Sequence, residues 1–237
     1  MRRDYLVWRS YRFHAVGQFL GAVGLLIVTY YVGRALAGVN TNYIAYFLVG
    51  VTFTDLLIVC LRSTQVSLRE AQIMGTFETM LMTPLPVWQF MAGCGAYRLV
   101  SSWARTAVII LGATTVFGYW HGANVFSSLM ILVPAVAVFV SMGLIAGAAS
   151  IVFKQADHLI AGYVGLSFVC SGTVFPVVLL PGWIQGLTGL LPMAHVLKGI
   201  RLALDGAQPG VVASEAIVLA MVAAVLLPLS MLLIHAS

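Results

Sequence analysis

Residues 128–150 read SLMILVPAVAVFVSMGLIAGAAS and contain no Asp, Glu, Lys or Arg. A helix that rises about 1.5 Å per residue needs about 20 such residues to cross a hydrocarbon layer about 30 Å thick. The run is apolar on every face, whereas a strand of a membrane barrel would be shorter and would alternate apolar with polar residues. The stretch therefore predicts a membrane-spanning helix.

The composition of the whole chain extends this prediction. Of the 237 residues, 61% are hydrophobic and 8% are charged, and the mean hydropathy is +1.02. A soluble domain carries about 25% charged residues, so this chain lacks the polar surface that water requires. We expect an all-α integral membrane protein with one transmembrane domain over residues 1–237. Its six predicted transmembrane helices are 15–33, 43–61, 99–118, 128–150, 159–180 and 216–234.

The basic residues predict the orientation of these helices. If the amino terminus is inside, nine of the twelve Lys and Arg residues fall at the cytoplasmic side, which places both termini in the cytoplasm of a bacterial inner membrane. Residues 1–14 mix Arg with aromatic side chains, so they predict either a helix in the cytoplasmic interface or a plain flanking anchor. Because the cations lie beside spans and not on one basic face, no nucleic-acid partner is expected.

The longest cytoplasmic connection covers residues 62–90, and it predicts two helical pieces that are split at Gly75. The second piece ends at Pro84 and has an apolar face that is too short to be stable alone. That face is formed by Phe77, Met80 and Leu81. The piece either folds back on the inner ends of the spans or docks into a groove of a soluble partner. The chain has no Gly-x-x-x-x-Gly-Lys-Ser/Thr motif, so any ATP hydrolysis requires another polypeptide.

A second interrupted segment precedes the last span. Residues 183–191 are apolar but too few to cross the membrane, and Pro181 and Pro192 bracket them. Two short helices that enter the outer leaflet and return would keep their backbone groups satisfied against protein. We therefore predict a re-entrant region at residues 181–204, with an ordinary interfacial helix as the alternative.

Several ionisable residues fall within or beside the predicted spans. Asp55 and Arg105 share a depth roughly 10 Å from the cytoplasmic boundary, so they can form an ion pair between the second and third spans. The alternative is a proton or substrate relay through the same residues. Arg98 lies on the same face of its helix as Arg105. Near the outer surface, Lys198 and Arg201 could meet an anionic headgroup or sugar phosphate, or could simply snorkel.

No catalytic or metal-binding pattern is found in the sequence. The five histidines are far apart, and a Gly-x-Ser-x-Gly nucleophile motif is absent. Asp157-His158 predicts a solvated turn, and Gly143 with Gly147 predicts close helix packing within the chain. The three cysteines, Cys60, Cys94 and Cys170, are odd in number and predict buried free thiols.

Two segments resemble the permease subunits of type-2 ABC exporters. Residues 69–84, RExxxMGTFExMLxTP, are similar to the coupling-helix region of that family, and residues 175–183, FPxxxLPxW, are similar to its re-entrant region. The resemblance assigns ATPase docking to Gly75, Thr76, Phe77, Glu78, Met80, Leu81 and Pro84. It assigns the outer gate to Phe175, Pro176, Pro181, Trp183, Pro192 and Arg201.

The resemblance also implies an activity and partners. Two permease copies, expected to form a homodimer, would work with two cytoplasmic ABC ATPase subunits that bind ATP and Mg, so this chain itself would be neither an enzyme nor a cofactor carrier. The complex would move a drug, lipid, glycolipid or polysaccharide outward. A self-contained secondary transporter or channel that uses Asp55 and the broken helix at 181–192 is the alternative.

Overall fold

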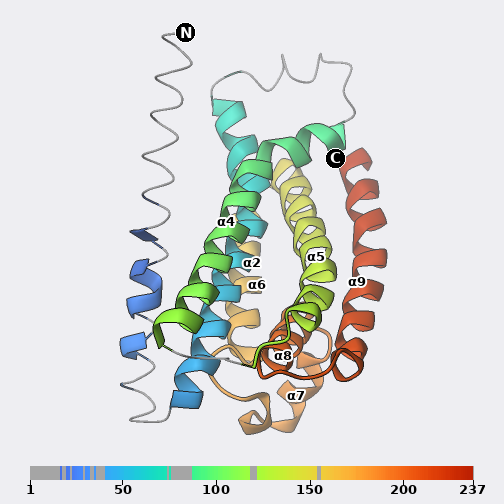
Figure 1. The fold of residues 1–237 in the computed structure, drawn as a ribbon. Helices are drawn as coiled ribbons and strands as arrows, with labels where there is room; N and C mark the ends of the chain where they lie inside the picture. Colours follow the sequence, from blue (N-terminus) through green and yellow to red (C-terminus); the bar gives the residue numbers. More distant parts are fainter. Residues whose placement is uncertain are drawn as a thin grey trace.

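The computed structural model describes residues 17, 20–21, 23–28, 30–32, 35, 41–73, 75, 87–117, 122–153 and 156–236. Every regular element within these ranges is a helix, as the sequence predicts. The elements are α2 (Thr41–Ile73), α4 (Val87–Phe117), α5 (Val125–Val152), α6 (Ala156–Cys170), the 3-10 helix η1 (Val177–Leu179), α7 (Gly182–Thr188), α8 (Pro192–Leu204) and α9 (Pro209–Ala236). The long helices run side by side, with α7 and α8 at one end of the bundle and the carboxyl end of α9 at the other (Figure 1).

Three helices of the described part are long and apolar enough to cross a membrane. They are Tyr43–Val66, Val125–Ser150 and Pro209–Leu233, which overlap the second, fourth and sixth predicted spans. The bent pair of α7 and α8 would add a fourth if it is one broken span. These helices agree with a membrane protein, while the number of six spans stays a prediction.

The ends of the bundle differ from the predicted spans. The second span does not end at residue 61, because α2 continues without a break to Ile73, and α4 already begins at Val87. Residues 62–73 and 87–90 of the predicted cytoplasmic connection therefore belong to these two helices. Residues 1–14 lie outside the described residues, and residues 15–33 lie partly outside them.

The predicted fifth span at 159–180 is wrong at its carboxyl end, because α6 stops at Cys170. Gly172 takes a φ of +76°, a conformation that ends a helix and favours glycine. Pro176 then disfavours a helical conformation for the residue before it. The freed carbonyls find partners on α2, since the Tyr46 hydroxyl donates to the Gly172 carbonyl at 2.8 Å. We call residues 171–176 the α6 turn.

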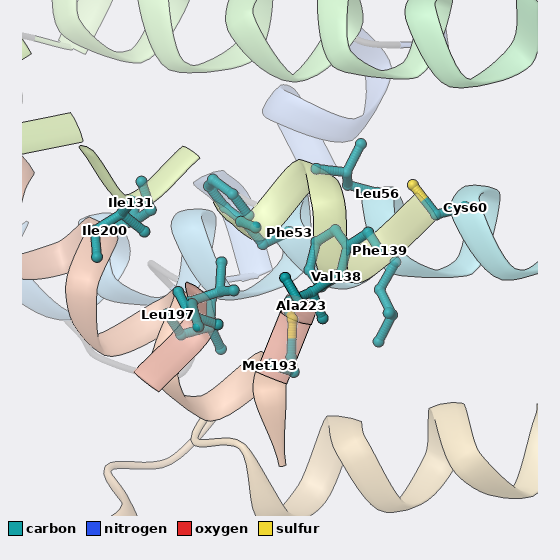
Figure 2. Packing of buried hydrophobic residues seen from close by; sticks show 14 of the residues in the cluster. Phe53, Leu56, Cys60, Ile131, Val138, Phe139, Met193, Leu197, Ile200 and Ala223 are labelled. Atoms are coloured by element: carbon teal, nitrogen blue, oxygen red, sulfur yellow. The ribbon is translucent and has the colours of Figure 1, made fainter. Parts of the chain in front are cut away.

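The apolar core is formed by α2, α5, α8 and α9, to which α6 adds Ile160, and lies along the middle of the bundle. Figure 2 shows its centre, where side chains of α2 and α5 meet those of α8. The fully buried large side chains there include Phe53, Leu56, Phe139, Met193, Leu197 and Ile200. The short helix α8 is thus packed inside the bundle and does not lie on its surface.

Two glycines allow backbones to approach closely around α2. A Cβ at Gly143 of α5 would lie 2.4 Å from the Cys60 carbonyl oxygen, and one at Gly50 would lie 2.3 Å from the Thr173 carbonyl oxygen. The first contact confirms the prediction that Gly143 serves packing within the chain. Cys60 and Cys170 are buried free thiols, as predicted, while the side chain of Cys94 lies outside the described part.

Candidate functional site

The predicted ion pair within the bundle is present. Asp55 on α2 and Arg105 on α4 form a salt bridge, and their side chains are 33% and 21% exposed. Arg98 lies about two helical turns before Arg105 and is partly buried. The pair therefore joins α2 to α4, as the sequence predicts.

Asp55 also borders a cavity of about 520 Å³ between α2 and α6. Arg62, about two turns further along α2, lines the same cavity. The opposite wall is formed by the apolar side of α6. The carboxylate is thus paired on one side and open to the cavity on the other. This arrangement fits both predictions for Asp55, a structural ion pair and a polar group beside a proton or substrate pathway.

Asp157 does not lie in a solvated turn, so that prediction is wrong. It lies in the first turn of α6, where its carboxylate accepts hydrogen bonds from Gln65 Nε2 at 2.7 Å and from Arg69 Nη1 at 3.0 Å. A carboxylate in the first turn of a helix is also favoured by the helix dipole. These contacts fasten the extended carboxyl end of α2 to the start of α6.

The predicted coupling helix follows α2, and Gly75 is the one residue of residues 74–86 that the structure describes. Gly75 follows the end of α2 with a φ of +67°, which suits a glycine that stops a helix. The other predicted docking residues lie outside the described residues, and their role stays a prediction. They are Thr76, Phe77, Glu78, Met80, Leu81 and Pro84.

At the opposite end of the bundle, α7 and α8 meet at 84°. Pro181 precedes α7 and Pro192 is the first residue of α8, positions that proline tolerates because no helical N–H is lost there. The bend is the geometry of a broken span or of a re-entrant loop. Phe175 and Trp183 are largely exposed beside it, at 55% and 73%.

Helix α8 has two different faces. Its apolar face enters the core, and its buried residues include Met193, Val196, Leu197, Ile200 and Leu204. The other face carries His195, Lys198 and Arg201 and lines a second cavity of about 500 Å³, which we call the α8 cavity. Pro176 lines it too, so the structure brings two of the predicted gate residues, Pro176 and Arg201, to one cavity.

A carboxylate that the sequence analysis missed lies behind this face. Glu215 of α9 is 8% exposed, accepts a hydrogen bond from Lys198 Nζ at 2.5 Å and lies 2.6 Å from His195 Nδ1. The signal was available, because Glu215 is the lone acidic residue of an apolar helix of 28 residues. The predicted sixth span begins one residue after it, at residue 216.

Arg201 is held against α2. Its guanidinium carbon lies 3.4 Å from the centre of the Tyr46 ring, and its Nη2 donates to the Tyr46 carbonyl at 3.1 Å. Tyr46 in turn donates to the α6 turn at Gly172. One aromatic residue therefore connects α2, α8 and the α6 turn.

Comparisons with known proteins agree with these features. The family model described as ABC-2 type transporter matches residues 1–204, a range that includes both the predicted coupling segment and α8. The chain is 26% identical to Nodulation protein J of Sinorhizobium fredii over 215 residues, which are 86% of this chain and 79% of that protein. It is 26% identical to Nodulation protein J of Rhizobium meliloti, over 84% of this chain and 78% of the relative. It is 27% identical to Nodulation protein J of Neorhizobium galegae, over 86% and 79%. The chain belongs to the ABC-2 type transporter family.

Proposed function

We propose that this chain, the membrane subunit of an ABC transporter, moves a hydrophobic or amphiphilic substrate outward with ATP that a separate ATPase subunit hydrolyses. The observation that carries the proposal is the family match over residues 1–204. Family membership implies an ATP-binding partner subunit. We further propose a bacterial inner-membrane location, two copies of that ATPase and a homodimer of this chain.

The arrangement of the helices supports this division of labour. The carboxyl end of α2 and the amino end of α4, which the predicted coupling connection joins, lie at one end of the bundle, and α7 and α8 lie at the other (Figure 1). The carboxyl end of α9 lies at the same end as the carboxyl end of α2. If that connection meets a cytoplasmic ATPase, the carboxyl terminus is cytoplasmic and the α8 cavity faces the outer side.

A physical connection between the two ends also supports the proposal. At the inner end, Gln65 and Arg69 hold Asp157, and at the outer end Tyr46 holds the α6 turn. A force applied at the predicted docking residues would therefore reach α6 at both of its ends. We propose that substrate passes between two copies of this chain, and that this force opens the outer side.

The alternative of a self-contained secondary transporter or channel has one feature in its favour, the cavity beside Asp55. Family membership favours the ATP-driven function instead. The two differ in a simple way, because a secondary transporter would move its cargo along an ion gradient without nucleotide and without a second subunit.

Co-purification tests the partner that the proposal requires. The chain is expressed with an ABC ATPase of the same genome, and Phe77 and Leu81 are each changed to Asp, which places charge on the predicted docking face. We expect the ATPase to be lost from the purified membrane fraction. Thr79→Asp is the matched control, because residue 79 points away from that face in a helix.

The result that contradicts the docking proposal is equal retention of the ATPase by all three variants. Reconstituted vesicles then test the activity. ATP-dependent movement of an amphiphile is expected only when both subunits are present. Movement by this chain alone, driven by an ion gradient, would overturn the proposed function.

A further inference from the structure

We propose that the α8 cavity binds the phosphate group of a membrane amphiphile. The cavity, about 500 Å³ in volume, is large enough for a lipid headgroup, since small-molecule sites begin at about 300 Å³. The inference rests on the proposed function in one respect, namely that α7 and α8 lie at the outer face of the membrane.

The first observation is an unused donor. Arg201 lines the cavity, and its Nε is buried without a hydrogen-bond partner among the described residues. The rest of its guanidinium is fixed by Tyr46, and it forms no ion pair with a carboxylate of the described part. A buried donor without a partner costs free energy, so a ligand that accepts from it gains affinity. A guanidinium fits the oxygens of a phosphate particularly well.

The second observation is that two basic side chains, Lys198 and His195, are held in place by one carboxylate. Lys198 is 67% exposed and uses its ammonium group to bind Glu215, yet an ammonium has three protons to donate. His195 lies between two acceptors, with Nδ1 at 2.6 Å from Glu215 and Nε2 at 3.0 Å from the Gly189 carbonyl. Glu215 therefore orients both side chains along the wall of the cavity.

The third observation is the charge balance. Asp205 is the one acidic residue that lines the cavity, and Glu215 lies behind its wall. The two carboxylates balance Lys198 and Arg201. Among the ionisable residues that line the cavity itself, Lys198 and Arg201 are basic and Asp205 is acidic, so an incoming anion meets two basic groups and one carboxylate.

The fourth observation is an apolar rim. Large apolar side chains on η1, on α7 and beyond it are exposed to more than two thirds of their full area, and one of them, Val178, lines the cavity. They are Val178, Leu179, Trp183 and Leu190. A free anion makes no favourable contact with apolar side chains, whereas the acyl chains of a lipid can lie against them. The combination of cationic wall and apolar rim favours a phosphate that is carried by a lipid.

The test measures lipid binding by the purified chain, with no nucleotide and no ATPase, so its outcome is separate from that of the transport experiments. Thermal stabilisation in detergent is titrated with phosphatidylglycerol, with diacylglycerol, which lacks the phosphate, and with inorganic phosphate. We expect phosphatidylglycerol to bind at least tenfold more tightly than either of the others.

Two variants locate the site. Lys198→Gln removes the exposed ammonium and leaves His195 as the partner of Glu215, while Arg201→Gln removes the unused donor. We expect each to weaken phosphatidylglycerol binding about tenfold. Arg69→Gln, which removes a similarly exposed cation at the other end of the bundle, is the matched control and should bind as the wild type does.

Three results would overturn the proposal. One is equal binding of diacylglycerol, which would make the phosphate irrelevant. Another is inorganic phosphate competing as well as the lipid, which would indicate a site for a free anion. The third is unchanged lipid binding by Lys198→Gln, which can be read even if Arg201→Gln does not fold.

Discussion

Replacing Asp55 by Ala should destabilise the protein through the charge that it leaves behind. In the folded chain Arg105 is 21% exposed and faces the Asp55 carboxylate. Without that carboxylate the guanidinium keeps its positive charge in a largely apolar bundle, with too little water to solvate it. The change should therefore cost more than the loss of one surface contact.

The magnitude follows from the exposure of the two side chains. Breaking a fully buried pair costs about 3–5 kcal/mol, and an exposed pair is worth about 0–1 kcal/mol. At 33% and 21% exposure the Asp55–Arg105 pair lies nearer the buried limit. We expect a loss of about 2–3 kcal/mol, which corresponds to a fall of roughly 5–10 °C in melting temperature for a chain of this size.

Thermal unfolding in detergent, followed by the amount of monodisperse protein that survives heating, measures this loss. Arg69→Ala is the matched control, because its pair with Asp157 has side chains 65% and 51% exposed and should be worth less than about 1 kcal/mol. The double variant Asp55→Ala, Arg105→Met removes both charges and should recover most of the stability.

Two outcomes would refute this reasoning. If Asp55→Ala melts within about 1 °C of the wild type, the pair does not support the fold and the carboxylate serves the cavity beside it. If the double variant is less stable than Asp55→Ala alone, the cost does not come from an unpaired guanidinium.

Three further substitutions test the packing of the helices by the same measurement. Gly143→Ala should destabilise by about 1–3 kcal/mol because its Cβ would meet backbone of α2, whereas Gly162→Ala, with nothing within 4 Å, should be neutral or slightly stabilising; equal effects would contradict the close approach. Asn124→Ala should cost about 1 kcal/mol because the side chain caps α5 by accepting from two backbone N–H groups, and Asn124→Asp should restore it. Tyr46→Phe should cost about 1 kcal/mol by removing the hydrogen bond to Gly172, and an unchanged melting temperature would show that this bond does not hold the α6 turn.

The sequence predicts the long apolar helices well, because a bilayer imposes a length and a composition that a single run of residues reveals. It also predicts the Asp55–Arg105 pair, since both depths follow from helical rise alone. It fails where the structure depends on distant partners. The helix α6 stops at Cys170 before Gly172, and the carbonyl of Gly172 is satisfied by Tyr46, more than a hundred residues earlier, a partner that no local pattern reveals.

The candidate site shows the same division. The prolines at 181 and 192 predict a break, and the structure has one there, where α7 and α8 meet at 84°. The sequence does not show which face of α8 is buried, because that depends on the helices that pack against it. Glu215 lies one residue before the predicted sixth span, and its partners, Lys198 and His195, lie 17 and 20 residues away on another helix. Spacing within one helix cannot indicate a contact between two.

The unbroken course of α2 has a mechanical consequence. Its 33 residues form a rod about 50 Å long, well beyond the roughly 30 Å of a hydrocarbon layer. A rod without a hinge converts a small tilt at one end into a displacement at the other, and about 10° around its midpoint moves each tip by about 4 Å. Tyr43 and Tyr46 lie near the amino end of α2 and donate hydrogen bonds to carbonyls of the α6 turn. A tilt of α2 would therefore move the α6 turn directly, with no flexible segment between the two.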